Sequence, residues 1–163
     1  MSGRLQVVGD SSFEDFYDRE YRAVLAFSRS LSPTRQHAED ITHDAFEVAL
    51  RKWQTIDNPT SWIRQVVANK TKSMLRRRYA EQRAVNRLSG RVTIGVDLPE
   101  DTEAFWAEVR RLPHQQRVAI ALFYLEDRPV AEIAEVLECA ETTARVHLLR
   151  GRRSLAERLD VEA

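Results

Sequence analysis

The stretch PVAEIAEVLECAETTARVHLLRGRRSL, residues 129–155, predicts two short helices joined by a tight turn. Pro129 suits a first helical position, and the next apolar residues recur at the spacing of one helix face: Val130, Ile133, Ala134 and Leu137. The turn falls at residues 138–140, and a second helix from Glu141 turns Ala144, Leu148, Leu155 and Leu159 inward. This layout predicts a helix-turn-helix, in which the second helix enters a DNA major groove.

Charge is separated between these two helices. Residues 142–158 hold five arginines and one glutamate, whereas residues 126–141 hold six acidic residues and one arginine. An ordinary helical hairpin would share the apolar periodicity, but this separation favours DNA binding. Arginine can bond guanine or hold a phosphate, and the sequence leaves both roles open. The residues left free to meet DNA are Thr142, Thr143, Arg145, His147, Arg150, Arg152 and Arg153.

The composition is that of a folded protein that binds nucleic acid only through local patches. The chain has 163 residues, of which 43% are hydrophobic and 31% charged, and its formal net charge is zero. Cys139 is the only cysteine, the four histidines are scattered, and no glycine-rich phosphate loop is present, so we expect no enzyme, metal or cofactor. Without a long apolar run, we expect a cytoplasmic protein and no membrane insertion.

The rest of the chain predicts an all-α protein, because strand signals are nearly absent. Helices are expected at residues 13–30, from Ser32-Pro33 to about Trp53, and from Pro59 to about Tyr79. Periodicity fades and then returns near residue 101, continuing through Val118 and Leu122. We therefore expect two small helical domains: an N-terminal helical bundle at 1–80, a flexible linker at 81–100 and a C-terminal helix-turn-helix domain at 101–163.

Two predicted helices carry polar faces. Asp40, Asp44 and Glu47 form a stripe of like charge, which predicts a basic partner or, alternatively, a solvated acidic face. The third helix leaves amide, hydroxyl and cationic groups on its circumference, which suit contacts with phosphates and base edges. These residues are Arg64, Asn69, Lys72, Ser73, Arg76 and Arg77.

Five stretches then resemble, in the correct order, the extracytoplasmic-function sigma factors, which are specificity subunits of bacterial RNA polymerase. They are FEDFYDREYRAVLAFSRSL at 13–31, AED with DAF at 38–46, NPTSWIRQVVANK leading into RRR at 58–78, LPHQQRVAIALFYLED at 112–127, and AEIAEVL through TTARVHLLRGRRSL at 131–155. The resemblance covers most of the chain. It implies a protein that binds core RNA polymerase and directs initiation at promoters, without catalysis of its own.

The resemblance also implies a role for each polar face. Asp40, His43, Asp44 and Glu47 would dock on the clamp helices of the largest polymerase subunit. Asn69, Lys72, Ser73, Arg76 and Arg77 would recognise and hold open the minus-10 element of promoter DNA. In the minus-35 element, Arg145, His147 and Arg150 would face the groove, with Thr142, Thr143, Arg152 and Arg153 at phosphates. A cognate anti-sigma factor is a further implied partner.

The chain departs from the family pattern at two positions near the turn. Glu138 stands where relatives often have glycine, so we expect the backbone there to give up the left-handed conformation that glycine favours. Val146 replaces a commonly polar position, which favours contact with a thymine methyl group. The alternative function is a free-standing helix-turn-helix transcriptional regulator, which leaves the acidic stripe and the basic third helix unexplained.

Overall fold

The computed structural model describes residues 2–89 and 103–159, and all regular structure within them is helical. The all-α prediction is confirmed. The elements are α1 (Ser2–Leu31), α2 (Arg35–Lys52), the 3-10 turn η1 (Trp53–Thr55), α3 (Pro59–Ser89), α4 (Glu103–Arg110), α5 (His114–Tyr124), α6 (Val130–Leu137) and α7 (Glu141–Leu159).

Helices α1, α2 and α3 pack into an N-terminal bundle around an aromatic core. Phe16 and Phe27 of α1, Phe46 of α2, and Ile63 and Val67 of α3 are all buried. Each such side chain contributes about 1.5–3 kcal/mol through removal of its apolar surface from water. Leu50 of α2 follows Phe46 at helical spacing but is not part of this core, since its side chain is 56% exposed.

Two helix boundaries differ from the expected ones. The hydroxyl oxygen of Thr34 accepts a hydrogen bond from the backbone N–H of His37 at 3.1 Å, so Thr34, rather than Ser32, caps α2. At the other end of the bundle, α3 continues to Ser89, so residues 81–89 of the predicted linker are helical. The rest of that predicted linker, residues 90–100, lies outside the described residues.

Helices α4–α7 form the C-terminal domain, and α6 and α7 are the helix-turn-helix that the sequence predicts. Helix α7 buries Ala144, Leu148, Gly151 and Leu155 against α5 and α6. At Gly151 the two helices approach so closely that a Cβ atom would lie 2.8 Å from Cγ1 of Ile120. Any larger residue at this position would therefore force the Ile120 side chain or the helices to shift.

Glu138 corrects one expectation. Its backbone keeps the left-handed conformation, with φ 55° and ψ 45°. This conformation lets the backbone N–H of Glu138 donate to Glu135 and that of Cys139 donate to Ala134, at 3.2 and 3.0 Å. These bonds satisfy carbonyls at the end of α6. The tight turn is thus kept without glycine, at the cost of a strained glutamate.

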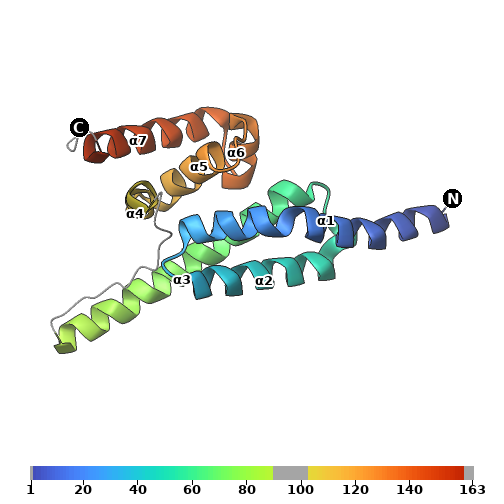
Figure 1. Ribbon diagram of the computed structural model, residues 1–163, viewed down its shortest axis with the longest axis horizontal. Helices are drawn as coiled ribbons and strands as arrows, with labels where there is room; N and C mark the ends of the chain where they lie inside the picture. Colours follow the sequence, from blue (N-terminus) through green and yellow to red (C-terminus); the bar gives the residue numbers. More distant parts are fainter. Residues whose placement is uncertain (1, 90–102, 160–163) are drawn as a thin grey trace.

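The two domains pack against each other. Figure 1 shows α4–α7 gathered on one side of the α1–α3 bundle, with the C-terminal end of α3 projecting beyond it. Helix α6 contacts α3, while α4 and α5 contact the end of α1. The guanidinium of Arg110 crosses this interface to the carbonyl oxygens of Ser32 and Arg29, at 3.1 and 2.8 Å.

No helix in the described ranges is both long and apolar enough to cross a lipid bilayer.

Candidate nucleic-acid interface

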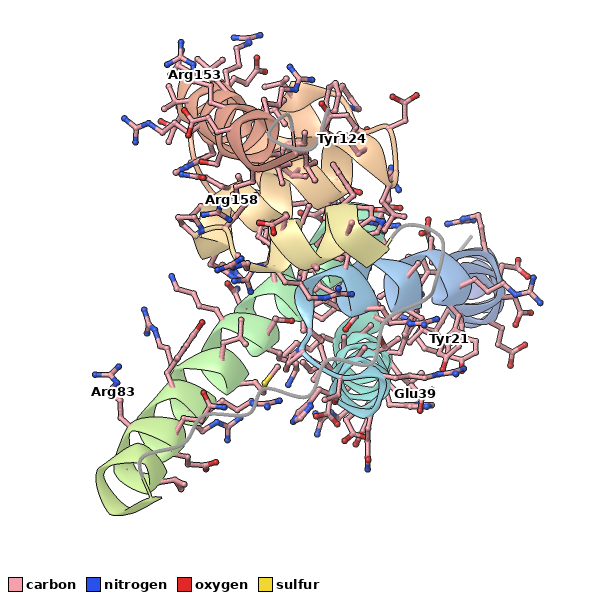
Figure 2. The ribbon with its side chains drawn as sticks, turned by 60° about the vertical axis from the view of Figure 1, so that its left-hand side comes forward. Tyr21, Glu39, Arg83, Tyr124, Arg153 and Arg158 are labelled. Carbon is pink, nitrogen blue, oxygen red and sulfur yellow. The ribbon has the colours of Figure 1, made fainter. Side chains whose placement is uncertain are left out.

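The outer face of α7 carries the residues predicted to contact DNA. Six of the seven are exposed, whereas His147 is half-buried. The exposed ones are Thr142, Thr143, Arg145, Arg150, Arg152 and Arg153. Figure 2 shows Arg153 on α7 pointing away from the α1–α3 bundle. The structure therefore leaves the middle of this helix face open to a DNA groove.

Two of these arginines already have partners within the C-terminal domain. Arg145 lies 3.6 Å from Glu141, one turn earlier on α7. Arg152 donates from Nε to the hydroxyl of Tyr124 at 3.0 Å, and its guanidinium lies 4.3 Å from the ring centre of Phe123. Cation–π contact of this kind holds Arg152 against α5 at the edge of the exposed face. Arg150 and Arg153 lie nearer its middle.

The middle of the face also carries two apolar side chains. Val146 is 42% exposed and Leu149 is 48% exposed. At helical spacing, Thr142, Val146, Leu149, Arg150 and Arg153 share the side opposite the buried Ala144, Leu148 and Leu155. Sequence reasoning singled out Val146 but missed Leu149. Leu149 lies seven residues after Thr142, and this spacing predicts that both residues share one face of the helix.

The residues predicted for the minus-10 element form one continuous band on α3. Asn69, Ser73 and Arg77 line a groove of about 420 Å³ against α2, where Asp40 is also present. Lys72 and Arg76 lie on the other edge of the band, in a groove of about 390 Å³ against α5. The five residues are thus brought together, and the band borders α2 on one side and the C-terminal domain on the other.

The acidic face of α2 is exposed at Asp40, His43, Asp44 and Glu47. None of its three carboxylates has a salt-bridge partner within the part of the chain that the structure describes. On the α1 side of this face, the rings of Tyr21 and His43 lie 6.0 Å apart. Burial, followed by the neighbouring Tyr17 and Glu39, raises the pKa of Tyr21, so its phenol stays neutral.

Arg64 corrects the expectation that it lies on the exposed circumference of α3, because its side chain is only 1% exposed. Its guanidinium donates to Glu126 of the C-terminal domain, to Glu20 of α1 and to the carbonyl of Thr60. Burial alone would lower the pKa of Arg64, but the bonds and charges of Glu126 and Glu20 outweigh it and raise that pKa. Arg64 therefore joins the two domains. We call this packing of the two domains against each other the closed arrangement.

Among the described residues, no cluster of histidine, cysteine, aspartate or glutamate could hold a metal ion. Cys139 is a free, half-buried thiol whose pKa is raised by burial.

Two family models match the chain: sigma-70 region 2 at residues 16–81 and sigma-70 region 4 at residues 102–155. Together they span well over half of it. It is 28% identical over 157 residues to the ECF RNA polymerase sigma factor SigM of Mycobacterium tuberculosis, covering 94% of this chain and 80% of SigM. The chain belongs to the extracytoplasmic-function (ECF) sigma factors. This ECF sigma factor is also 26% identical over 170 residues to SigW of Bacillus subtilis, covering 91% and 89% of the two chains.

Solved structures show the same fold. The sigma factor RpoE of Bartonella quintana, solved in complex with the anti-sigma factor NepR, matches this ECF sigma factor with a TM-score of 0.78 and 25% identity. The match covers 93% of this chain and 99% of RpoE. CnrH, solved with the cytosolic domain of CnrY, matches with a TM-score of 0.70 at 19% identity, covering 94% and 91%. The region 2 match contains the α2 and α3 faces of this sigma factor, and the region 4 match contains its helix-turn-helix.

Proposed function

We propose that this ECF sigma factor binds core RNA polymerase through α2 and directs initiation through separate DNA contacts on α3 and α7. The observation that carries the proposal is the presence of two exposed cationic faces on two domains, each inside its own sigma-70 match. A free-standing helix-turn-helix regulator would need only the second of these faces. The protein acts without catalysis, in the cytoplasm, where its polymerase and template are.

Asp40, His43, Asp44 and Glu47 are the proposed polymerase contacts. The carboxylates project from one exposed side of α2, where like charges at this spacing repel each other by a few tenths of a kcal/mol. A basic surface would relieve that repulsion. The clamp helices of the largest polymerase subunit are the proposed partner surface.

The α3 band is the proposed minus-10 contact. Asn69 and Ser73 supply an amide and a hydroxyl that can bond base edges, and Lys72, Arg76 and Arg77 supply charges that can hold phosphates of an opened strand. The exposed face of α7 is the proposed minus-35 contact. Arg150 lies nearest a groove-facing position, with Thr142, Thr143 and Arg153 beside it, while Arg145, His147 and Arg152 flank them.

The closed arrangement cannot serve both DNA elements at once. Elements centred 25 base pairs apart are separated by roughly 85 Å of B-form DNA. The α3 band borders α5, and α7 packs on α5, so the two faces lie within about three helix diameters, or roughly 30–36 Å, of each other. We therefore propose that helices α1–α3 and α4–α7 separate on the polymerase, with the segment that connects α3 to α4 spanning the distance. An anti-sigma factor is a proposed partner of the closed form, since the similar RpoE was solved with one.

Reconstituted transcription tests this proposal. Purified protein added to core polymerase should produce one defined start site, and Asp44→Lys should abolish both start-site selection and binding to core polymerase. Arg35→Gln, an exposed change on the side of the same helix opposite the acidic stripe, serves as the control. Unchanged start-site choice on addition of the wild-type protein, together with tight binding of DNA in the absence of polymerase, would instead identify a free-standing regulator.

A further inference from the structure

A cavity of about 550 Å³ lies between the two domains, next to one edge of the α3 band. The end of α1, the middle of α3, α4 and the start of α5 all contribute to its wall. Its lining residues are Leu31, Pro33, Leu75, Arg78, Tyr79, Gln82, Ala107, Arg110, Arg111 and Arg117. Four of these are arginines, and none is acidic.

Among the described residues, the charge of Arg117 in this wall has no carboxylate partner. Arg117 is 6% exposed, and its guanidinium donates to the neutral carbonyls of Leu31 and Leu112, at 3.4 and 3.0 Å. Its Nε atom, and Nη1 of Arg78 across the cavity, are buried without a hydrogen-bond partner among the described residues. Arg64 shows the contrast, because two carboxylates surround it in the same interface. A buried charge left without a counter-ion is costly, and an anion would relieve that cost.

The positive field extends into the neighbouring groove of about 390 Å³. That groove shares Leu75, Tyr79, Arg111 and Arg117 with the cavity and adds Lys72, Arg76 and His114. Burial, followed by the charges of Arg117, Lys72 and Arg76, lowers the pKa of His114 to about 4. Both domains thus contribute cations to one site. One of these cations, the exposed Arg111, lies 3.6 Å from Glu108.

The rest of the wall is suited to an apolar or aromatic group. Leu31, Pro33, Leu75 and Ala107 are apolar, and the Tyr79 side chain is 53% exposed, so a ring could stack on it. Pockets for small organic ligands usually measure about 300–1,000 Å³ and combine apolar walls with a few polar groups. An α-helix with its side chains is about 10–12 Å wide, which is too large for a space of this volume.

We propose that this interdomain cavity binds a phosphorylated organic anion of nucleotide size. Its phosphates would lie against Arg78, Arg111 and Arg117, and its ring against Tyr79 and Leu75. Because the wall comes from both domains, the ligand would stabilise the closed arrangement. It would also cover Lys72 and Arg76, two residues of the α3 band. The binding claim itself does not depend on the proposed function, whereas competition with minus-10 DNA does.

Calorimetric titration of the full chain with ATP and GTP tests the site. At least one nucleotide should bind with a micromolar Kd, and Arg78→Gln or Arg111→Gln should each weaken it tenfold or more. Arg83→Gln is the matched control, since Arg83 lies on the projecting end of the same helix and points into solvent (Figure 2). Tyr79→Ala should weaken the nucleotides but not inorganic tripolyphosphate. Equal affinity for tripolyphosphate and nucleotides, or an equal loss with Arg83→Gln, would reduce the effect to general charge attraction and overturn the proposal.

A second measurement tests the interdomain character of the site. Glu126→Gln weakens the domain contact without touching the cavity wall, so it should weaken nucleotide binding several-fold. Nucleotide should also raise the concentration of single-stranded minus-10 DNA needed for half-saturation. If nucleotide binds but leaves DNA binding unchanged, the nucleotide site in the cavity is supported, and its overlap with the α3 band is refuted. If only an acidic peptide binds, the small-molecule site is refuted.

Discussion

Arg64 in α3 and Glu126 in the turn after α5 form a buried ion pair that joins the two domains. Nε of Arg64 lies 2.7 Å from one carboxylate oxygen of Glu126, and the side chains are 1% and 6% exposed. Glu20 of α1 binds the same guanidinium at 2.8 Å. This triad joins α1, α3 and the turn after α5. In the closed arrangement of the sigma factor, the three charged groups are shielded from water.

Glu126→Gln should open the interface. Removing one partner of a buried ion pair typically costs about 3–5 kcal/mol, although Glu20 remains to offset part of the charge of Arg64. Small-angle X-ray scattering should show a larger radius of gyration for the variant, and denaturant unfolding should show a lower midpoint. Glu132→Gln removes a partly exposed pair with Arg128 within one domain, and it should change the free energy of unfolding by less than about 1 kcal/mol. Equal radii for wild type and Glu126→Gln would show that the triad does not hold the domains together.

The same variant should bind core polymerase more tightly. If only the open form can place both domains on the polymerase, the apparent Kd is the intrinsic Kd divided by the open fraction. Raising the open fraction therefore lowers the apparent Kd in proportion. Fluorescence anisotropy of labelled protein with core polymerase measures this. A weaker complex for Glu126→Gln, with an unchanged fold, would show that polymerase accepts the closed form.

Val146 and Leu149 should give the minus-35 contact a preference for thymine. Each buried methyl-sized group contributes about 0.8 kcal/mol, so replacing one contacted thymine by uracil, which lacks the methyl group, should weaken holoenzyme binding about fourfold. Val146→Ser or Leu149→Ala should remove that sensitivity to uracil. Promoter competition assays with uracil placed singly through the element provide the measurement, and uracil in the spacer is the control. A wild-type holoenzyme indifferent to every uracil position contradicts this reading of the α7 face.

His114 should make stability depend on pH. Its folded pKa of about 4 lies below the ordinary value of 6.5, so between these values the unfolded chain binds more protons. The stability from neutral His114 is present above pH 6.5 and is lost as pH falls toward 4, by about 2 kcal/mol between pH 7.5 and 5. Wild type and His114→Gln should therefore diverge over this range in denaturant unfolding, since carboxylates titrate in both. Parallel pH profiles would contradict the burial of His114.

Gly151→Ala should destabilise the C-terminal domain. The new Cβ would lie 2.8 Å from Cγ1 of Ile120, and overpacking of this kind costs about 1–3 kcal/mol. Thermal unfolding of the variant should show a lower Tm. Ile120→Val removes Cδ1, which lies 3.2 Å from the new Cβ position, so Gly151→Ala should cost less in an Ile120→Val background than in the wild type. A Tm that is unchanged or raised would mean that α5 and α7 separate at little cost.

Local patterns determined the helices and the faces of this protein. The periodicity of residues 129–155, the turn at 138–140 and the inward residues of α7 depend on neighbours within one or two helical turns, so the sequence predicted them correctly. The exposed acids of α2 and the polar band of α3 follow from the same spacing. Leu50 shows the limit of such patterns: it follows Phe46 at helical spacing but is 56% exposed, because periodicity shows which side of a helix is apolar but not how far along it the neighbouring helix extends.

Tertiary structure alone decided the state of the arginines between the domains. Arg64 looks like an exposed cation in the pattern of α3, yet Glu20 and Glu126, 44 and 62 residues away in the chain, bury and neutralise it. Arg117 lies in an apolar stretch, and its sequence context does not predict that it will face a cavity and donate to two backbone carbonyls. The position of a residue along a helix determines the face on which its side chain lies. Its solvation and charge balance depend on which distant segments the folded chain brings beside it.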